Sequence, residues 1–328
     1  MPYPIADLHC DLLSYLSKIP KSSPFDKEQI ACAIPWLLEG KVKLQVMAIY
    51  TDVQKGSMVS ATKQAHIFED LLQRYPDILH QVNLAFLENF SQKSEIGILA
   101  AIENAAGIGD EQASWKEIYP QFDALLKSVG QFAYISLTHH TENRFGGGNY
   151  TEGIGLKEDG KRLLDYMAGK RIPIDLSHTS DLLAEGILSY VDRHRLPIPV
   201  MASHSNFRSL WDHKRNLSDE FAQEIVHREG IIGVNFLRAF LDDKVPERLF
   251  DHLLYGIQLN ENAICFGADF FYTADFPDLS RHPFYFPVAA HAGKYPSILE
   301  KLSTSATVPQ LKKVAYENVV RFYQKIWN

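Results

Sequence analysis

Histidine and acidic residues recur at the ends of short apolar runs along this 328-residue sequence. Imidazole and carboxylate groups that meet in one place can hold divalent cations, and such cations activate water for hydrolysis. A single histidine at the end of a strand is more often structural, but perturbed ionisable groups cluster at functional sites, and the repetition favours a site. The residues at or just past these run ends are His9, Asp11, Glu103, His139, His178, His204, Asn235 and Asp269.

The first two residues of this set are separated by a single cysteine. On an extended segment, His9 and Asp11 project from the same face, so one cation could contact both. Cys10 then points the other way and is expected to be a small buried residue. A turn at the end of a strand is the alternative explanation for His-x-Asp.

Glu103 follows the apolar run 97–102, so its carboxylate is expected to be largely buried and to need a compensating charge. Two sources of that charge fit the sequence equally well. One is a pair of cations bridged by the carboxylate, and the other is a salt bridge to Arg144 or another base.

His178 and His204 end two consecutive runs, so their imidazoles could bind the same metal ion. Asp175 and Ser177 precede the first of them and could orient the ligands or serve in packing.

Two further residues have both a chemical and a structural interpretation. Asp269 stands two positions after Gly267, which permits close backbone approach, and it is a candidate general acid/base or, alternatively, a cap of the segment that follows. Arg215 lies in the polar loop 213–216, where it is either solvated or binds a substrate carboxylate.

The elements that must position these residues are short strands followed by helices. Amphipathic stretches such as 161–169 and 181–195 separate apolar runs that are rich in branched and aromatic residues. Eight such units predict an α/β protein with a (β/α)8 TIM barrel, a single domain over 1–328, and reactive groups at the C-terminal strand ends. The eight runs are residues 5–9, 44–51, 96–103, 132–139, 172–178, 198–204, 231–235 and 264–269.

Composition excludes several classes of protein. With 46% hydrophobic and 22% charged residues, the chain is not disordered, and a net charge of −7 without like-charge blocks disfavours nucleic acid and anionic membranes as partners. Three cysteines without a CxxC pair argue against a disulfide framework and favour a reducing compartment. Because neither an export signal nor a membrane span is recognisable, we expect a cytoplasmic protein that acts on a small-molecule or peptide substrate.

Several motifs, in this order and spacing, resemble the membrane (renal) dipeptidase family of zinc metallopeptidases, peptidase family M19. The resemblance covers nearly the whole chain. The segments that carry it are residues 7–12, 38–45, 136–139, 174–180, 203–205, 215–216, 267–270 and 318–322.

The resemblance implies a TIM barrel related to the amidohydrolases, with two zinc ions that share a bridging glutamate and a bridging water. By this resemblance, His9 and Asp11 would bind one zinc ion, His178 and His204 the other, and Glu103 both.

The resemblance also implies roles for three other residues. His139 would contact the substrate and stabilise the tetrahedral intermediate, Arg215 would hold the carboxylate of the dipeptide, and Asp269 would be the catalytic general acid/base. The expected function is zinc-dependent hydrolysis of dipeptides by a metal-bridging hydroxide, and members of the family are often homodimers.

The chain departs from the family pattern at a few positions that bear on the substrate. Asn104-Ala105 follow the glutamate where Gly-Gly is usual, Phe271 and Tyr272 replace Asp-Gly, and Leu237 stands where some members have a tyrosine. These departures keep two alternatives open. One is hydrolysis of a lactam, lactone or N-acyl amino acid, and the other is a non-catalytic barrel that binds metal.

Overall fold

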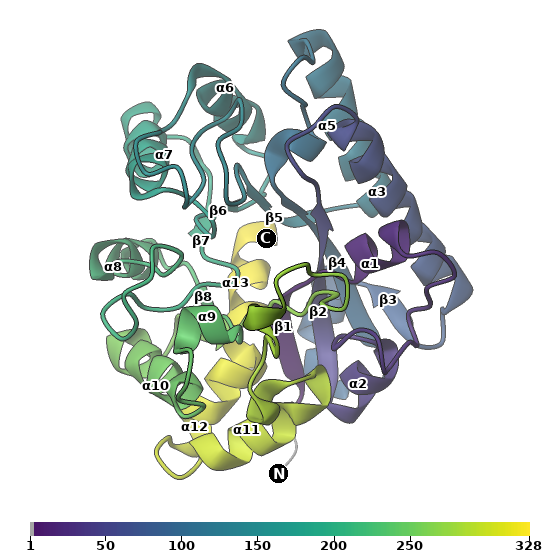
Figure 1. The fold of residues 1–328 in the computed structure, drawn as a ribbon, viewed down its shortest axis with the longest axis vertical. Helices are drawn as coiled ribbons and strands as arrows, with labels where there is room; N and C mark the ends of the chain where they lie inside the picture. The colour runs from purple at the N-terminus through teal and green to yellow at the C-terminus, as the bar shows by residue number, and fades with distance from the viewer. Residues whose placement is uncertain (1–2) are drawn as a thin grey trace.

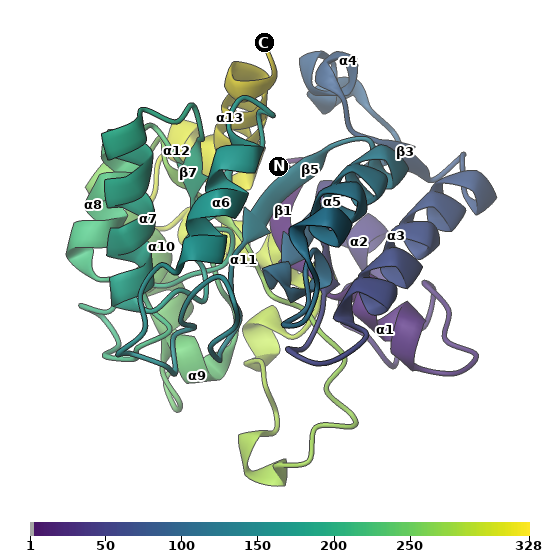
Figure 2. The ribbon, with the colours of Figure 1, turned by 90° about the horizontal axis from the view of Figure 1, so that it is seen from above.

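The computed structural model describes residues 3–328, and its centre is a ring of parallel strands surrounded by helices (Figure 1, Figure 2). Its strands are β1 (Ile5–Cys10), β2 (Val42–Tyr50), β4 (Ile96–Glu103), β5 (Phe132–Ser136), β6 (Ile174–Asp175), β7 (Val200–Met201), β8 (Ile232–Val234) and β9 (Ile264–Phe266). They are neighbours in the order β7-β6-β5-β4-β2-β1-β9-β8. A bridge between Ala202 and Ile232 links β7 to β8, so the barrel is nearly closed and the predicted (β/α)8 fold is confirmed.

The strands differ from the predicted runs mainly in length. β4 has the predicted bounds, whereas β5, β6 and β7 stop early, so His139, His178 and His204 each lie three residues past a strand. Past the ends of β6 and β7, backbone amides bond to a carboxylate instead of to a neighbouring strand. Asp175 Oδ1 accepts the backbone N–H groups of Ser177 and Ser203. An additional strand, β3 (Leu79–Gln81), pairs with β4 outside the ring and was missed because three residues show no usable alternation.

Helices cover the outside of the barrel and close one of its ends. The predicted helical stretches 161–169 and 181–195 correspond to α6 (Glu158–Met167) and α7 (Asp181–His194). The remaining helices are α1 (Leu12–Lys18), α2 (Ile34–Glu39), α3 (Ser57–Arg74), α4 (Leu84–Glu88), α5 (Trp115–Val129), α8 (Asp219–His227), α9 (Arg238–Leu241), α10 (Arg248–Asn260), α11 (Tyr295–Leu302), α12 (Val308–Lys312) and α13 (Asn318–Trp327). Within residues 3–328, none of these helices has the length and apolar character needed to cross a bilayer.

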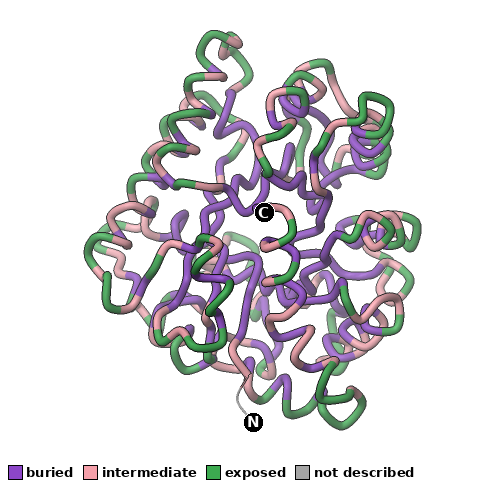
Figure 3. The backbone as a smooth tube through the Cα atoms, turned by 180° about the vertical axis from the view of Figure 1, so that it is seen from behind, coloured by how far each residue is buried: buried purple, intermediate pink, exposed green. Residues whose placement is uncertain are grey.

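The buried residues form two apolar clusters, one between the strands and the surrounding helices and one inside the barrel. Figure 3 shows the buried strands at the centre and the exposed turns on the periphery. In the inner cluster, Leu8, Val46 and Leu99 from three strands pack with Phe322 and Tyr323 of α13. Because α13 and these side chains fill the interior, the polar residues at the strand ends are left facing the other end of the barrel.

A buried carboxylate fixes the start of the first strand relative to its neighbours. Asp7 Oδ1 accepts hydrogen bonds from His9 N and Gln45 Nε2, at 3.0 and 2.8 Å. Its other oxygen accepts Ala268 N at 2.9 Å and the hydroxyl of Tyr295. Burial raises the pKa of Asp7, opposed by these four donors. The carboxylate therefore holds β1, β2 and the segment after β9 in one register, which positions His9.

His252 on α10 gives the fold a measurable dependence on pH. Its ring is buried, accepts Phe207 N at Nδ1 and hydrogen-bonds Leu241 O through Nε2, and burial lowers its pKa to about 4. The unfolded chain takes up the proton near pH 6.5, so this contribution is complete above that pH and is lost as the pH falls towards 4. We expect it to amount to about 3 kcal/mol of the free energy of unfolding.

The measurement is urea unfolding at a series of pH values for the wild type and for His252→Gln, whose side-chain oxygen can still accept Phe207 N. Between pH 7 and pH 4.5 the variant should lose less free energy of unfolding than the wild type. Equal losses in the two proteins would show that His252 does not carry this pH dependence.

Candidate active site

Ionisable side chains from five strand ends meet at the open end of the barrel. They belong to or follow β1, β4, β6, β7 and β9, and they are His9, Asp11, Glu103, His178, His204 and Asp269. All six are buried. Residues from positions 9 to 269 are therefore neighbours in space, because parallel strands bring their C-terminal ends to one side of the barrel.

Glu103 lies between two groups of donors. Its Oε2 atom is 3.5 Å from His9 Nε2, while its Oε1 atom is 2.9 Å from His178 Nε2 and 3.4 Å from His204 Nε2. Each oxygen of the carboxylate thus faces a different group. The alternative partner considered for this residue is wrong, since Arg144 pairs with Asp159 at 2.8 Å.

The donor set fits divalent cations at two adjoining positions. His9, Asp11 and Glu103 have ligand atoms within 4.8 Å of one another, and so do Glu103, His178 and His204. His9 Nε2 and Asp11 Oδ1 are buried without a hydrogen-bond partner, which is costly unless a further group satisfies them. Nitrogen and carboxylate oxygen in this combination are ligands that zinc prefers, so the residues present fit the metals implied by the family resemblance.

Two hydroxyl groups orient the imidazoles so that their Nε2 atoms face inward. Tyr134 Oη donates to Leu8 O at 3.2 Å and lies 2.6 Å from His9 Nδ1, so it accepts the Nδ1 proton. In the same way, Ser203 Oγ donates to Asp175 at 2.6 Å and accepts from His204 Nδ1 at 2.5 Å. Partners of this kind fix the tautomer of a metal-binding histidine.

Sequence reasoning missed both hydroxyl groups. The position of Ser203 directly before His204 was a signal that its hydroxyl could orient that imidazole. Tyr134 is the one hydroxyl-bearing aromatic residue in β5, at a position that faces the barrel interior. Asp175 and Ser177 lie behind the histidines, where Ser177 Oγ accepts His204 N at 3.1 Å.

The electrostatics of the site favour positive charge. Burial opposes protonation of His9, but Glu103, and then Asp11 and Asp269, outweigh it and raise the pKa of His9 to about 10. Burial also raises the pKa of the Glu103 carboxyl, with His9 opposing. Three carboxylates around one buried imidazole therefore create a potential that attracts cations.

Asp269 stands at the edge of this group in a strained backbone position, with φ of 62°. Its Oδ2 atom accepts Asn235 Nδ2 at 2.8 Å, and its Oδ1 atom is 3.6 Å from His9 Nε2. Burial raises the pKa of Asp269 to about 6. Among the described residues no backbone amide donates to its carboxylate, which argues against a capping role.

A Cβ on Gly267 would lie 2.0 Å from Ser203 O, so the close backbone approach expected at Gly267 is confirmed.

Arg215 is buried rather than solvated in its loop. Its Nη1 atom donates to Ser205 Oγ and its Nη2 atom to His204 O, both at 2.9 Å, while Nε has no partner. The guanidinium lies 5.5 Å from the ring of Phe240, and within residues 3–328 it forms no ion pair. Arg215 does not itself line the cavity, but a buried cation without a counter-ion, next to a residue that does, fits the binding of an anionic group.

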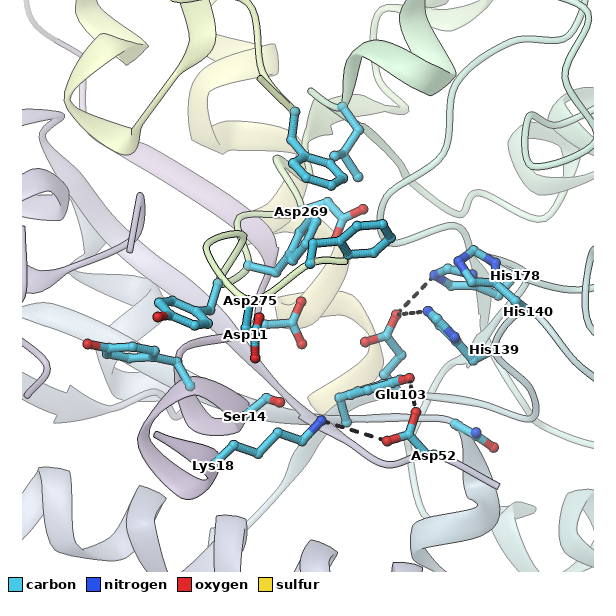
Figure 4. Close-up of a pocket in the computed structure, with 18 of the residues that line it drawn as sticks. Asp11, Ser14, Lys18, Asp52, Glu103, His139, His140, His178, Asp269 and Asp275 are labelled. Atoms are coloured by element: carbon cyan, nitrogen blue, oxygen red, sulfur yellow. Dashed lines mark hydrogen bonds and ion pairs between the residues drawn. The ribbon is translucent and has the colours of Figure 1, made fainter. Parts of the chain in front are cut away.

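A cavity of about 490 Å³ opens over these candidate metal ligands, within the size range of small-molecule sites. His139 lines it, with Nε2 3.9 Å from Glu103 Oε1 and its ring against Tyr50. Figure 4 shows His139, His140 and His178 on one side of Glu103, with Asp11 and Asp269 on the other. Burial lowers the pKa of His139, which keeps the imidazole neutral.

Three other residues of the cavity wall were not identified from the sequence. His140 follows His139 directly and hydrogen-bonds Asn149 at 3.0 Å. Lys18 lies at the end of α1, 3.8 Å from Asp52, and both line the cavity. Lysine and aspartate on a helix end and a loop carry no signal that separates them from ordinary surface residues.

Comparison with known proteins gives matches over the whole chain. The family model described as membrane dipeptidase (peptidase family M19) matches residues 2–328. Dipeptidase verJ of Clonostachys rogersoniana is 24% identical over 299 residues, which are 84% of this chain and 73% of that protein.

Two solved structures superpose over nearly their full lengths. One is a metallopeptidase from Rhodobacter sphaeroides liganded with a phosphinate mimic of the dipeptide L-Ala-D-Ala, with a TM-score of 0.82, 18% identity and 100% of both chains covered. The other is described as dipeptidase AC, a metallopeptidase of family M19, with a TM-score of 0.81, 19% identity and 100% and 99% of the two chains covered. At these identities the superpositions establish the fold.

Proposed function

The chain belongs to the membrane dipeptidase family, peptidase family M19, and from this premise we propose that it is a zinc-dependent dipeptidase that hydrolyses the peptide bond of dipeptides. The observation that carries the proposal is the position of Glu103, whose two oxygens face His9 on one side and His178 and His204 on the other. One carboxylate can therefore serve two metal positions at once.

His9, Asp11 and Glu103 would hold one zinc ion, and Glu103, His178 and His204 the other. When bound, such a pair of ions polarises the scissile carbonyl and lowers the pKa of a shared water from 15.7 to about 7. The protein contributes the orientation of the ligands, which Tyr134 and Ser203 fix through the Nδ1 atoms of two of the histidines.

His139 and Asp269 would supply the remaining chemistry. The neutral imidazole of His139 lines the cavity and can donate a hydrogen bond to the substrate oxygen on which negative charge develops. Asp269, with a pKa of about 6, is suited to take the proton of the attacking water and deliver it to the leaving amine at neutral pH. Asn235 holds the carboxylate in place for both transfers.

Arg215 would bind the free carboxylate of the dipeptide. Its guanidinium is buried, lacks an ion-pair partner within the described chain, and lies 5.5 Å from the ring of Phe240, which lines the cavity. A charge fixed close to the catalytic groups selects a substrate whose carboxylate lies one residue from the scissile bond, which favours dipeptides over proteins. The predicted cytoplasmic location and homodimer stay predictions.

Metal analysis combined with a hydrolysis assay tests the proposal. The purified protein should carry two equivalents of zinc, and removal of the metal by a chelator should lower dipeptide hydrolysis at least about 100-fold, because the metals supply the nucleophile. Added zinc should restore the activity.

A parallel panel of lactones and N-acyl amino acids tests the second candidate, which Leu237 and Phe271 favour because both apolar side chains line the cavity. If the enzyme leaves dipeptides intact and rapidly hydrolyses a lactone or an N-acyl amino acid, the second candidate replaces the proposed dipeptidase function.

A further inference from the structure

One side of the cavity is built from apolar side chains of two loops. This apolar wall consists of Leu237 and Phe240 after β8, and Phe271, Phe276 and Phe284 after β9, and all five line the cavity. Two charged residues of the second loop, Asp275 and Arg281, line the cavity as well, and the Arg281 guanidinium lies 5.3 Å from the ring of Phe276. Phe284 contacts the two other phenylalanines that this loop gives to the wall, with ring centroids 5.1 Å from Phe271 and 4.9 Å from Phe276. Figure 2 shows the loop after β9, in yellow-green, extending away from the barrel.

Backbone contacts join the two loops into one surface. Leu237 forms a bridge with Tyr285, and Arg238 N donates to Phe284 O at 3.0 Å. Arg238 also donates from its side chain to Pro283 O at 2.9 Å. The wall is therefore a connected surface rather than a set of separate side chains.

The wall is also tied to the general acid/base. Asn235 donates to Asp269 Oδ2 at 2.8 Å and accepts Leu237 N at 2.7 Å. From the other loop, Tyr285 Oη donates to Asp269 O at 2.5 Å and accepts Phe271 N at 3.2 Å. Leu237 and Phe271 are thus each held one hydrogen-bonded residue away from Asp269.

The opposite side of the cavity is polar. Lys18 lies 3.8 Å from Asp52, and Tyr50 Oη donates to Asp52 Oδ1 at 2.6 Å. Figure 4 shows Lys18 and Asp52 on the far side of Glu103 from Asp269. A side chain directed towards Asp269 consequently meets hydrocarbon, whereas one directed towards α1 meets charges.

The proposed interactions of Asp269 and Arg215 with a dipeptide determine which of its two residues lies against the apolar wall. Asp269 delivers its proton to the leaving amine, and that nitrogen belongs to the C-terminal residue. Arg215, which would hold the C-terminal carboxylate, lies 5.5 Å from the ring of Phe240. Amine, carboxylate and side chain branch from a single Cα atom, so the side chain of that residue lies against the same surface.

We propose that the apolar wall selects dipeptides whose C-terminal residue carries a large apolar side chain, with Leu237 as a specificity-determining residue. The inference rests on the proposed dipeptidase function. A leucine or phenylalanine side chain buries hydrocarbon against these five side chains, while an aspartate or lysine side chain placed against them would lose hydration that none of the five can replace.

The test measures kcat/KM for zinc-loaded enzyme on L-Ala–Xaa substrates. Xaa is Gly, or either configuration of Leu, Phe, Asp or Lys. We expect the better stereoisomer of the Leu and Phe substrates to exceed Gly, Asp and Lys by about 100-fold, in line with the 10- to 200-fold that a small apolar difference contributes in a hydrophobic pocket. Leu237→Ala should reduce the Leu-to-Gly ratio about tenfold, and Leu237→Met should retain it.

Leu279→Ala is the matched control, because Leu279 is in the loop after β9, is 77% exposed and does not line the cavity. The Leu-to-Gly ratio of this variant should equal that of the wild type. Zinc content and thermal unfolding verify that each variant is folded. Equal kcat/KM for all substrates, or a Leu237→Ala variant that slows every substrate alike, would overturn the specificity role and leave the dipeptidase function standing. If no dipeptide is cleaved by zinc-loaded enzyme, the proposed function fails together with this inference.

Discussion

Replacing Asp269 by asparagine is expected to lower kcat for dipeptide hydrolysis by about 100- to 10,000-fold, the range that general acid–base catalysis contributes. An asparagine oxygen can still accept the hydrogen bond from Asn235, so the side chain should keep its place. It cannot take up a proton near neutral pH, which Asp269 can, because burial raises its pKa to about 6. Steady-state kinetics with zinc-loaded protein measures the effect.

Zinc content separates this explanation from a loss of metal. Asp269→Asn should still carry two equivalents, because the five proposed ligands are unchanged. Asp275→Asn is a suitable control, since Asp275 is a second carboxylate on the cavity wall but belongs to none of the described clusters of potential metal ligands. Its kcat should stay within about threefold of the wild type. Unchanged turnover in Asp269→Asn would remove this residue from the mechanism.

The barrel could be predicted from the sequence because most inner strands are buried on both faces and read as largely apolar runs. β4 shows this most clearly, since all eight of its residues are buried and its predicted bounds are those observed. The last positions of several other runs, by contrast, are not strand. There the backbone amides bond to side chains such as Asp175, and an apolar pattern gives no sign of that exchange.

The residues that orient the site could not be found from spacing. Tyr134 and His9 are 125 positions apart, and their contact depends on two inward-facing positions of β1 and β5 that the barrel brings together. The two possible partners of Glu103 were also undecidable from the sequence, because the choice depended on Arg144 finding Asp159 on α6. Local pattern predicts which residues end a strand, whereas pairing across the barrel decides what each of them touches.

The departures from the family pattern are easier to interpret in the structure. Leu237 and Phe271 are far apart in the sequence, yet both line the cavity and both connect to Asp269 through one hydrogen-bonded residue. They change the surface that a substrate side chain meets and leave the donor set intact. This is the pattern expected when substrate choice varies on a fixed chemistry, since specificity depends on the cavity wall and catalysis on the strand ends.

The second large effect is expected for Glu103→Gln, which should abolish dipeptide hydrolysis and reduce bound zinc from two equivalents to one or none. A neutral amide cannot supply two anionic oxygens to two metal positions. The free energy of unfolding measured in the presence of zinc should also fall, because less zinc stabilises the folded protein. Zinc at 100 times its Kd stabilises a folded protein by about 2.7 kcal/mol per site, and the variant should lose most of this increment.

Zinc-free protein distinguishes lost metal binding from misfolding. Burial raises the pKa of the Glu103 carboxyl, opposed by His9, and Asp11 and Asp269 add like charge, so the zinc-free protein should stay folded with the neutral amide. Glu185→Gln, on the exposed surface of α7, is the control and should behave as the wild type with and without zinc. If Glu103→Gln retained two equivalents of zinc and full activity, the carboxylate would not join the two donor groups, and the proposed two-metal site would be wrong.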